Sequence, residues 1–197
     1  MVLFALTVHE VAHAWVADKC GDPTARLEGR ITLNPLPHLD PIGTICIMFG
    51  PIGWAKPVPV NPYNLRNPRR DDILVSAAGP AANFLMAIAC AFIFRLLVVF
   101  ANGAMPTQES NFLLWFALHL SYQGIEVACC LAIFNLIPIF PLDGSHVLKG
   151  LLPTDLAIKF EGLNPIMPIV LLALVLSGML GPILLPPIQF LVSLLTG

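Results

Sequence analysis

Four stretches of the chain are apolar enough to form helices in a lipid environment. Three of them, residues 73–101, 112–137 and 166–195, reach the roughly 20 apolar residues that cross about 30 Å of hydrocarbon. The fourth, residues 2–19, is shorter and contains polar side chains. The pattern predicts an all-α polytopic membrane protein with about four transmembrane helices, built as a single domain over residues 1–197.

Prolines and glycines interrupt the last apolar stretch, at Pro168, Gly178, Gly181, Pro182, Pro186 and Pro187. Proline removes a helical hydrogen bond and its ring clashes with the preceding turn, so one straight helix is disfavoured there. We therefore expect residues 166–195 to form a kinked helix or two half-helices.

Residues 42–55 are apolar but too short to span a bilayer, and Gly43, Gly50, Pro51 and Gly53 punctuate them. This pattern favours a re-entrant β-hairpin at the membrane edge, in a loop over about residues 42–60 between the first and second helices. A surface loop packed under the helices is the alternative.

Composition supports a membrane protein and excludes two other classes. The chain is 57% hydrophobic and only 11% charged, with a mean hydropathy of +0.82. So high an apolar content excludes a disordered chain. Ten Lys and Arg residues against twelve Asp and Glu give a net charge of -2, which argues against a nucleic-acid partner.

The positive charges predict an orientation in the membrane. Residues 102–111 contain no Lys or Arg, and residues 138–165 contain two. The loop between the first two helices carries most of the others, at Lys19, Arg26, Arg30, Lys56, Arg66, Arg69 and Arg70. Cytoplasmic loops are enriched in Lys and Arg, so this loop and residues 138–165 are expected in the cytoplasm.

The shortest apolar stretch carries candidate chemistry, because His9, Glu10 and His13 form an H-E-x-x-H sequence. A spacing of four places both imidazoles on one helix face, where they can share a metal ion with Glu10 beside them as a general base. Zinc in such a site lowers the pKa of its water and supports amide hydrolysis. Unpaired ionisable groups are costly in hydrocarbon, so a chance occurrence is disfavoured.

A zinc hydrolase needs a third protein ligand. Val16 and Lys19 stand where a metzincin has its Gly and third His, so that arrangement is excluded. Asp143 is favoured, because it follows a long apolar run that breaks into proline-rich backbone of a kind tolerated at membrane depth only around a site. The full set of candidates is Asp143, Glu126, His38, Asp40 and His146.

Three motifs in order resemble one known family. They are His9-Glu10-x-x-His13, Gly79-Pro80-Ala-Ala-Asn83 and Asn135-x-x-Pro138-x-x-Pro141-Leu-Asp143-Gly144. Together they resemble the site-2 proteases, which are intramembrane zinc metalloproteases, and most closely the small prokaryotic members that lack a PDZ domain. The resemblance covers most of the chain, to about Lys149.

The resemblance implies one Zn²⁺ per chain, held by His9, His13 and Asp143, with Glu10 as general base and acid. It places Asn83 and Asn135 near the metal, where they polarise the scissile carbonyl or hold the substrate backbone. The alternative for Asn83 is a hydrogen bond between packed helices, and for Asn135 a helix cap.

The same resemblance implies the setting of the reaction. The substrate is a membrane protein cleaved in or next to a transmembrane segment, and the lipid bilayer is a further partner. The site lies in the prokaryotic inner membrane and opens to the cytoplasm.

Two rival functions use the same residues. One is a catalytically silent membrane protein of this fold that binds a client, and the other is a metal-ion transporter. A transporter needs several intramembrane carboxylates along a path, and only Glu126 stands outside the motifs. The sequence does not set the oligomeric state.

Overall fold

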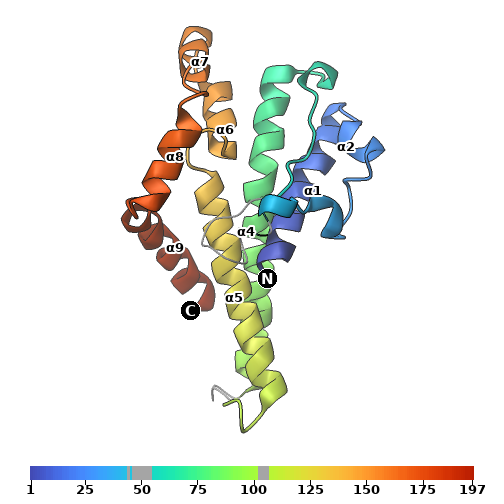
Figure 1. Ribbon diagram of the computed structural model, residues 1–197. Helices are drawn as coiled ribbons and strands as arrows, with labels where there is room; N and C mark the ends of the chain where they lie inside the picture. The colour runs from blue at the N-terminus through green and yellow to red at the C-terminus, as the bar shows by residue number, and fades with distance from the viewer. Residues whose placement is uncertain (44, 46–54, 102–106) are drawn as a thin grey trace.

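The computed structural model describes residues 1–43, 45, 55–101 and 107–197, and the regular secondary structure in these residues is helical (Figure 1). They contain no strand, only one isolated antiparallel bridge between Leu39 and Ala55. The all-helical class predicted from the sequence is therefore confirmed for the described residues.

Two long antiparallel helices form the centre of the molecule. Helix α4 (Pro68–Phe100) starts at a strong cap, because Asn67 Oδ1 accepts from the Arg70 N–H while Asp71 Oδ2 accepts from the Asn67 N–H. Helix α5 (Phe112–Asn135) starts where Asn111 Oδ1 accepts from the Leu114 N–H. Both caps lie in polar sequence just before the apolar runs, which explains why α4 begins earlier than the predicted residue 73.

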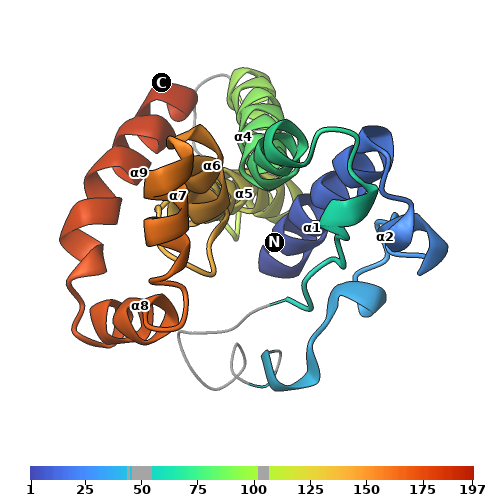
Figure 2. The same cartoon turned by 90° about the horizontal axis from the view of Figure 1, so that it is seen from above.

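The remaining helices flank this pair (Figure 2). On one side lie α1 (Val2–Cys20), α2 (Thr24–Leu27) and the 3-10 turns η1 (Leu36–His38) and η2 (Pro62–Asn64). On the other side lie the last two helices, α8 (Met167–Leu176) and α9 (Leu180–Thr196). Helix α1 runs beside only part of α4, and its N-terminal end lies partway along the α4–α5 pair (Figure 1).

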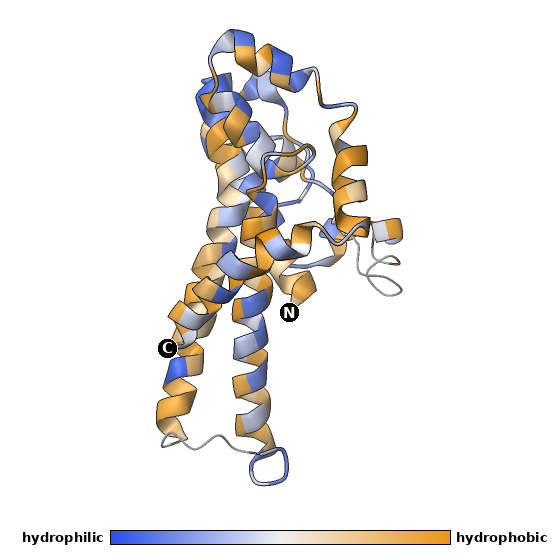
Figure 3. Ribbon diagram, turned by 90° about the vertical axis from the view of Figure 1, so that its left-hand side faces the viewer, coloured by the Kyte–Doolittle hydropathy of each residue, from blue (hydrophilic) through white to orange (hydrophobic). Residues whose placement is uncertain are grey.

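The last apolar stretch is divided, as its prolines and glycines predict. Helices α8 (Met167–Leu176) and α9 (Leu180–Thr196) meet at 79° across a short break. Gly178 lies in that break with φ 73°, a conformation that favours glycine. Helix α8 is hydrophobic along its whole length (Figure 3).

By length and composition, the described part of the chain has two helices able to cross a membrane, α4 and α5, or three if α8 and α9 form one broken span. Helix α1 is not among them, so the count of four spans stays a prediction. Most of the predicted re-entrant hairpin, residues 44 and 46–54, lies outside the described residues, and the bridge between Leu39 and Ala55 joins the chain on its two sides.

Small side chains let α1, α4, α5 and α9 pack closely, the usual solution where lipid supplies no hydrophobic drive between helices. The core that these helices share contains Ala5, Met86, Ala87, Ala91, Ile125, Ala128, Cys129 and Val192.

Helix α4 also contains one positively charged side chain, Arg95. Its guanidinium donates to the carbonyls of Leu194 and Leu195 and so caps the last turn of α9.

A buried carboxylate ties the end of α1 to the loop before α4. Gly21 ends α1 with φ 112°, and Asp22 then accepts hydrogen bonds from Thr24, Asn61 and Asn64. Burial works to raise the pKa of Asp22, but these hydrogen bonds outweigh it and hold the pKa below its usual value. The ionised carboxylate thereby fixes the path of residues 61–64.

Two short helices follow α5 at the same end of the molecule as the start of α4. Helix α6 (Asp143–Leu151) and α7 (Thr154–Glu161) are anchored there, since the Arg69 guanidinium donates to the carbonyls of Gly150, at 2.9 Å, and Leu152. This attachment brings the first residue of α6 against α1.

Candidate metal centre

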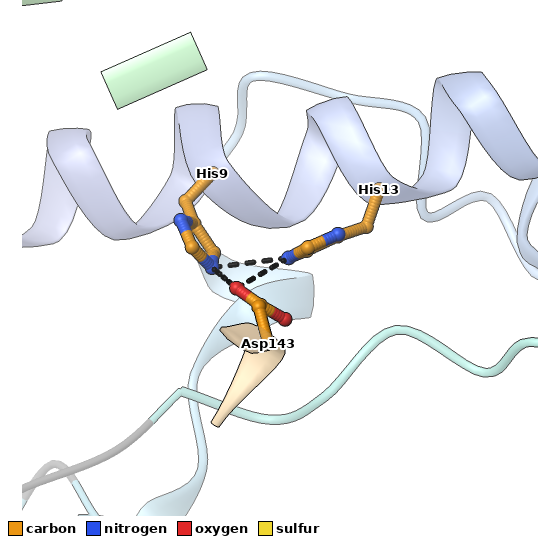
Figure 4. A group of neighbouring side chains, drawn as sticks. All are labelled: His9, His13 and Asp143. Atoms are coloured by element: carbon orange, nitrogen blue, oxygen red, sulfur yellow. Dashed lines mark hydrogen bonds and ion pairs between the residues drawn. The ribbon is translucent and has the colours of Figure 1, made fainter. Parts of the chain in front are cut away.

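Three side chains from two distant segments meet between α1 and α6 (Figure 4). His9 Nε2 lies 3.0 Å from His13 Nε2, and Asp143 Oδ2 lies 3.1 Å from the first and 3.4 Å from the second. Both histidines are buried, and the aspartate is largely so. The i, i+4 spacing accounts for the histidine pair, and the start of α6 supplies the carboxylate.

The donor set fits a tetrahedral divalent cation. Ligands about 2.0–2.1 Å from a zinc ion stand about 3.3 Å from one another, close to the three distances found here. His13 Nδ1 donates to the Val75 carbonyl at 2.7 Å, so the lone pair of His13 is on Nε2 and faces Asp143. Asp143 Oδ2 is buried without a hydrogen-bond partner among the described residues, which suits an oxygen aimed at a cation.

Helix α4 supports the histidines through one stripe of positions four residues apart. Val75 offers its carbonyl to His13, Gly79 lies against both rings, and the amide of Asn83 lies 3.0 Å from His9 Nδ1. A Cβ atom on Gly79 would stand 2.4 Å from His13 Nε2, so only glycine lets α4 come this close.

The carboxylate of Glu10 lies beside the cluster but outside it. Its Oε2 accepts from the Val58 N–H at 3.0 Å. In the two residues just before Val58, the carbonyls of Lys56 and Pro57 accept from the guanidinium of Arg30, a residue only 4% exposed. The buried arginine thus holds the segment whose backbone holds Glu10.

The two histidines, Asp143 and Glu10 line one cavity of about 330 Å³. Asn135, the last residue of α5, reaches the cavity while its amide donates to the Leu131 carbonyl one turn earlier in the same helix, at 2.9 Å. Polar lining makes the cavity suitable for water and for a peptide backbone. The lining is formed by His9, Glu10, His13, Pro57, Val58, Val60, Asp72, Val75, Ser76, Asn135, Pro141, Asp143 and His146.

Of the five candidates for the third ligand, the described structure brings only Asp143 into the group with the two histidines. His38 is buried against the Thr32 carbonyl, and Asp40 accepts from the Gly43 N–H. His146 reaches the cavity wall, where its Nδ1 lies 3.6 Å from Asp72 Oδ2. Glu126 is not among the cavity residues.

Sequence reasoning missed the supporting contacts of Val75, Val58 and Arg30. Two of them use backbone atoms, whose partners no residue type reveals. Arg30 is one of many cationic residues in its loop, and nothing local distinguishes a buried arginine from an exposed one such as Arg26.

Comparisons with known proteins agree with the cluster. The chain matches Peptidase family M50 over residues 1–177. YwhC of Bacillus subtilis is 39% identical over 166 residues, which cover 80% of this chain and 70% of the relative. Rip2 of Mycolicibacterium smegmatis is 30% identical over 152 residues, 75% of this chain and 54% of the relative.

A third relative is archaeal: MJ0392 of Methanocaldococcus jannaschii is 24% identical over 152 residues, 77% of this chain and 33% of the relative. The names of all three describe zinc metalloproteases, the first two provisionally. No solved structure matches the chain. The family match and the apolar helices show that the chain belongs to Peptidase family M50, the site-2 protease family, and is an integral membrane zinc metalloprotease.

Proposed function

We propose that this chain is an intramembrane endopeptidase that hydrolyses a peptide bond in or next to a transmembrane segment of another membrane protein. The observation that carries the proposal is the meeting of His9, His13 and Asp143 beside Glu10, in one cavity between apolar helices. One Zn²⁺ per chain is held by the two histidines and the aspartate, and residues 1–197 act as a single domain.

The residues divide the work of hydrolysis. His9, His13 and Asp143 would hold the zinc ion, which would supply a Lewis acid that makes a nearby water easier to deprotonate. Glu10 takes the proton from the attacking water and delivers it to the leaving amine nitrogen. The Val58 N–H fixes Oε2 of Glu10, so Oε1 is the oxygen that carries the proton. The Asn135 amide donates to the carbonyl oxygen, on which negative charge develops.

The depth of the cluster supports cleavage within the membrane. Val75 and Asn83 lie seven and fifteen residues into α4, which corresponds to about 10 to 22 Å from its first residue. That end of α4 carries Arg69 and Arg70, so we place it at the cytoplasmic face of a prokaryotic inner membrane. Water then reaches the cavity from the cytoplasm along its polar wall.

Arg30 is expected to support turnover through Glu10. Changing Arg30 to Met frees the carbonyls of Lys56 and Pro57, loosens Val58 and misplaces the Glu10 carboxylate. We expect the cleavage rate to fall about 10- to 100-fold, with zinc content unchanged. Arg26→Met is the matched control, because Arg26 is exposed and, within the described residues, forms its ion pair with Asp18. Zinc loss in Arg30→Met would show instead that Arg30 supports the metal site.

The test of the proposed function joins metal content to cleavage. Elemental mass spectrometry of the detergent-purified protein should find about one zinc per chain, and His9→Ala and Asp143→Asn should each lose it. In proteoliposomes, a single-span test substrate should be cut at a bond in or beside its span, as mass spectrometry of the products would locate. Cleavage only in a soluble domain of the substrate would contradict the proposal.

The same experiment separates the client-binding alternative. A silent protein of this fold would retain a membrane client without cutting it, with or without zinc. Co-purification of the intact test substrate, with no product at any zinc concentration, would favour that alternative.

A further inference from the structure

The amide of Asn83 contacts the metal centre on the side away from the cavity. Asn83 has no exposed surface, and it is absent from the residues that line the cavity. Among the described residues, its side-chain hydrogen-bonding partner is His9, where 3.0 Å separates Asn83 Nδ2 from the ring Nδ1. In the described structure, a substrate carbonyl in the cavity would therefore not reach this amide.

The tautomer of His13 indicates which nitrogen of His9 must carry a hydrogen. A carbonyl only accepts hydrogen bonds, so the contact with Val75 places the hydrogen of His13 on Nδ1 and leaves Nε2 free to bind a metal. His9 also turns its Nε2 toward the candidate metal position, since this atom lies 3.0 Å from His13 Nε2 and 3.1 Å from Asp143 Oδ2. A metal-binding His9 must then carry its hydrogen on Nδ1, which requires an acceptor.

Asn83 holds that acceptor. Its Oδ1 is buried and has no hydrogen-bond partner among the described residues, while Nδ2 faces the ring. A half-turn of the amide exchanges the two atoms without changing the shape of the side chain. The exchange places Oδ1 opposite the N–H of His9.

We infer that Asn83 is a positioning residue, whose Oδ1 accepts from His9 Nδ1–H when zinc is bound and so fixes the ring for metal binding. The inference rests on the proposed ligand role of His9. It differs from the role implied by family resemblance, in which Asn83 acts on the substrate. Val75 and Asn83 then perform the same task about two helical turns apart, each holding one imidazole from α4.

Two variants separate acceptance from donation. Asn83→Asp keeps the acceptor oxygens and removes the donor, whereas Asn83→Leu keeps the size and removes both. Zinc affinity is measured in competition with a chelator at fixed pH, without any substrate. We expect Asn83→Leu to bind zinc about 10- to 100-fold more weakly and Asn83→Asp to stay within about threefold of the wild type or to bind more tightly.

Asn135→Leu is the matched control, because it removes an asparagine amide from the cavity without touching either histidine. Its zinc affinity should equal that of the wild type. The inference is overturned if Asn83→Asp weakens zinc binding as much as Asn83→Leu, or if Asn83→Leu binds zinc normally. In the latter case, loss of cleavage alone would return Asn83 to a role on the substrate.

A second measurement uses the wild-type protein and so does not depend on the folding of a variant. Nitrogen-15 NMR of the imidazoles in the zinc-loaded wild type should show His9 Nδ1 as a protonated, hydrogen-bonded nitrogen, and an unprotonated Nδ1 would overturn the inference. Failure of the wild type to bind zinc would defeat the proposed function as well. Normal zinc binding with no effect of Asn83→Leu defeats the inference alone.

Discussion

Replacement of Glu10 by glutamine is expected to abolish peptide hydrolysis while zinc stays bound. Glutamine has the same shape, and its Oε1 can still accept from the Val58 N–H, so the extended segment keeps its place. Glu10 is outside the group of three metal-facing side chains. The amide cannot take a proton from water, and loss of a general base costs about 10²- to 10⁴-fold in rate.

The measurement is the cleavage rate of the single-span substrate, with zinc content determined on the same sample. Glu126→Gln is the matched control, because Glu126 is a glutamate of helix α5 outside the cavity lining. It should cleave at the wild-type rate. Retained turnover in Glu10→Gln would assign the base to another residue, and loss of zinc would move Glu10 into the metal site.

Gly79→Ala is expected to remove zinc binding and, with it, hydrolysis. The added methyl group would stand 2.4 Å from His13 Nε2 and 2.5 Å from His9 Cε1, distances that real side chains do not tolerate. Either the rings turn away from Asp143 or α4 moves outward, and both changes separate the three ligand atoms. Alanine favours a helix over glycine by about 1 kcal/mol, so weakening of α4 itself cannot explain the loss.

Elemental analysis and chelator competition measure this effect directly. Gly181→Ala makes the same chemical change in helix α9, where nothing lies within 4 Å of the new atom, and it should bind zinc normally. Zinc binding at wild-type strength in Gly79→Ala would show that α4 does not press on the histidines as the structure has it.

The helices were largely predictable because their signals are local. Hydropathy placed the two long helices and the broken last stretch, since lipid selects apolar runs of spanning length. The break itself falls at Gly178, whereas Pro186 and Pro187 lie inside α9. The start of α4 was predicted too late, because Asn67 and Asp71 build its cap in polar sequence. Hydropathy does not detect such a cap.

The metal centre was predictable only in part. His9 and His13 meet because four residues make about one helical turn, a fact of local geometry. The third ligand was a choice among five residues, and Asp143 was favoured by its proline-rich setting rather than by distance. In the structure, Arg69 donates to the carbonyls of Gly150 and Leu152 at the end of α6 and so holds that helix, which begins at Asp143, beside α4.

The sequence by itself determined an all-helical membrane protein, a histidine pair at metal-ligand spacing with a glutamate beside it, and a family. These features follow from periodicity, composition and short motifs, which act over a few residues. Only the tertiary structure decided which atoms hold the histidines and the glutamate: the Val75 carbonyl, the Asn83 amide and the Val58 N–H. In each of those contacts the two residues are between 48 and 74 positions apart in the sequence. They meet because helices and loops pack against one another, and no local sequence pattern encodes that packing.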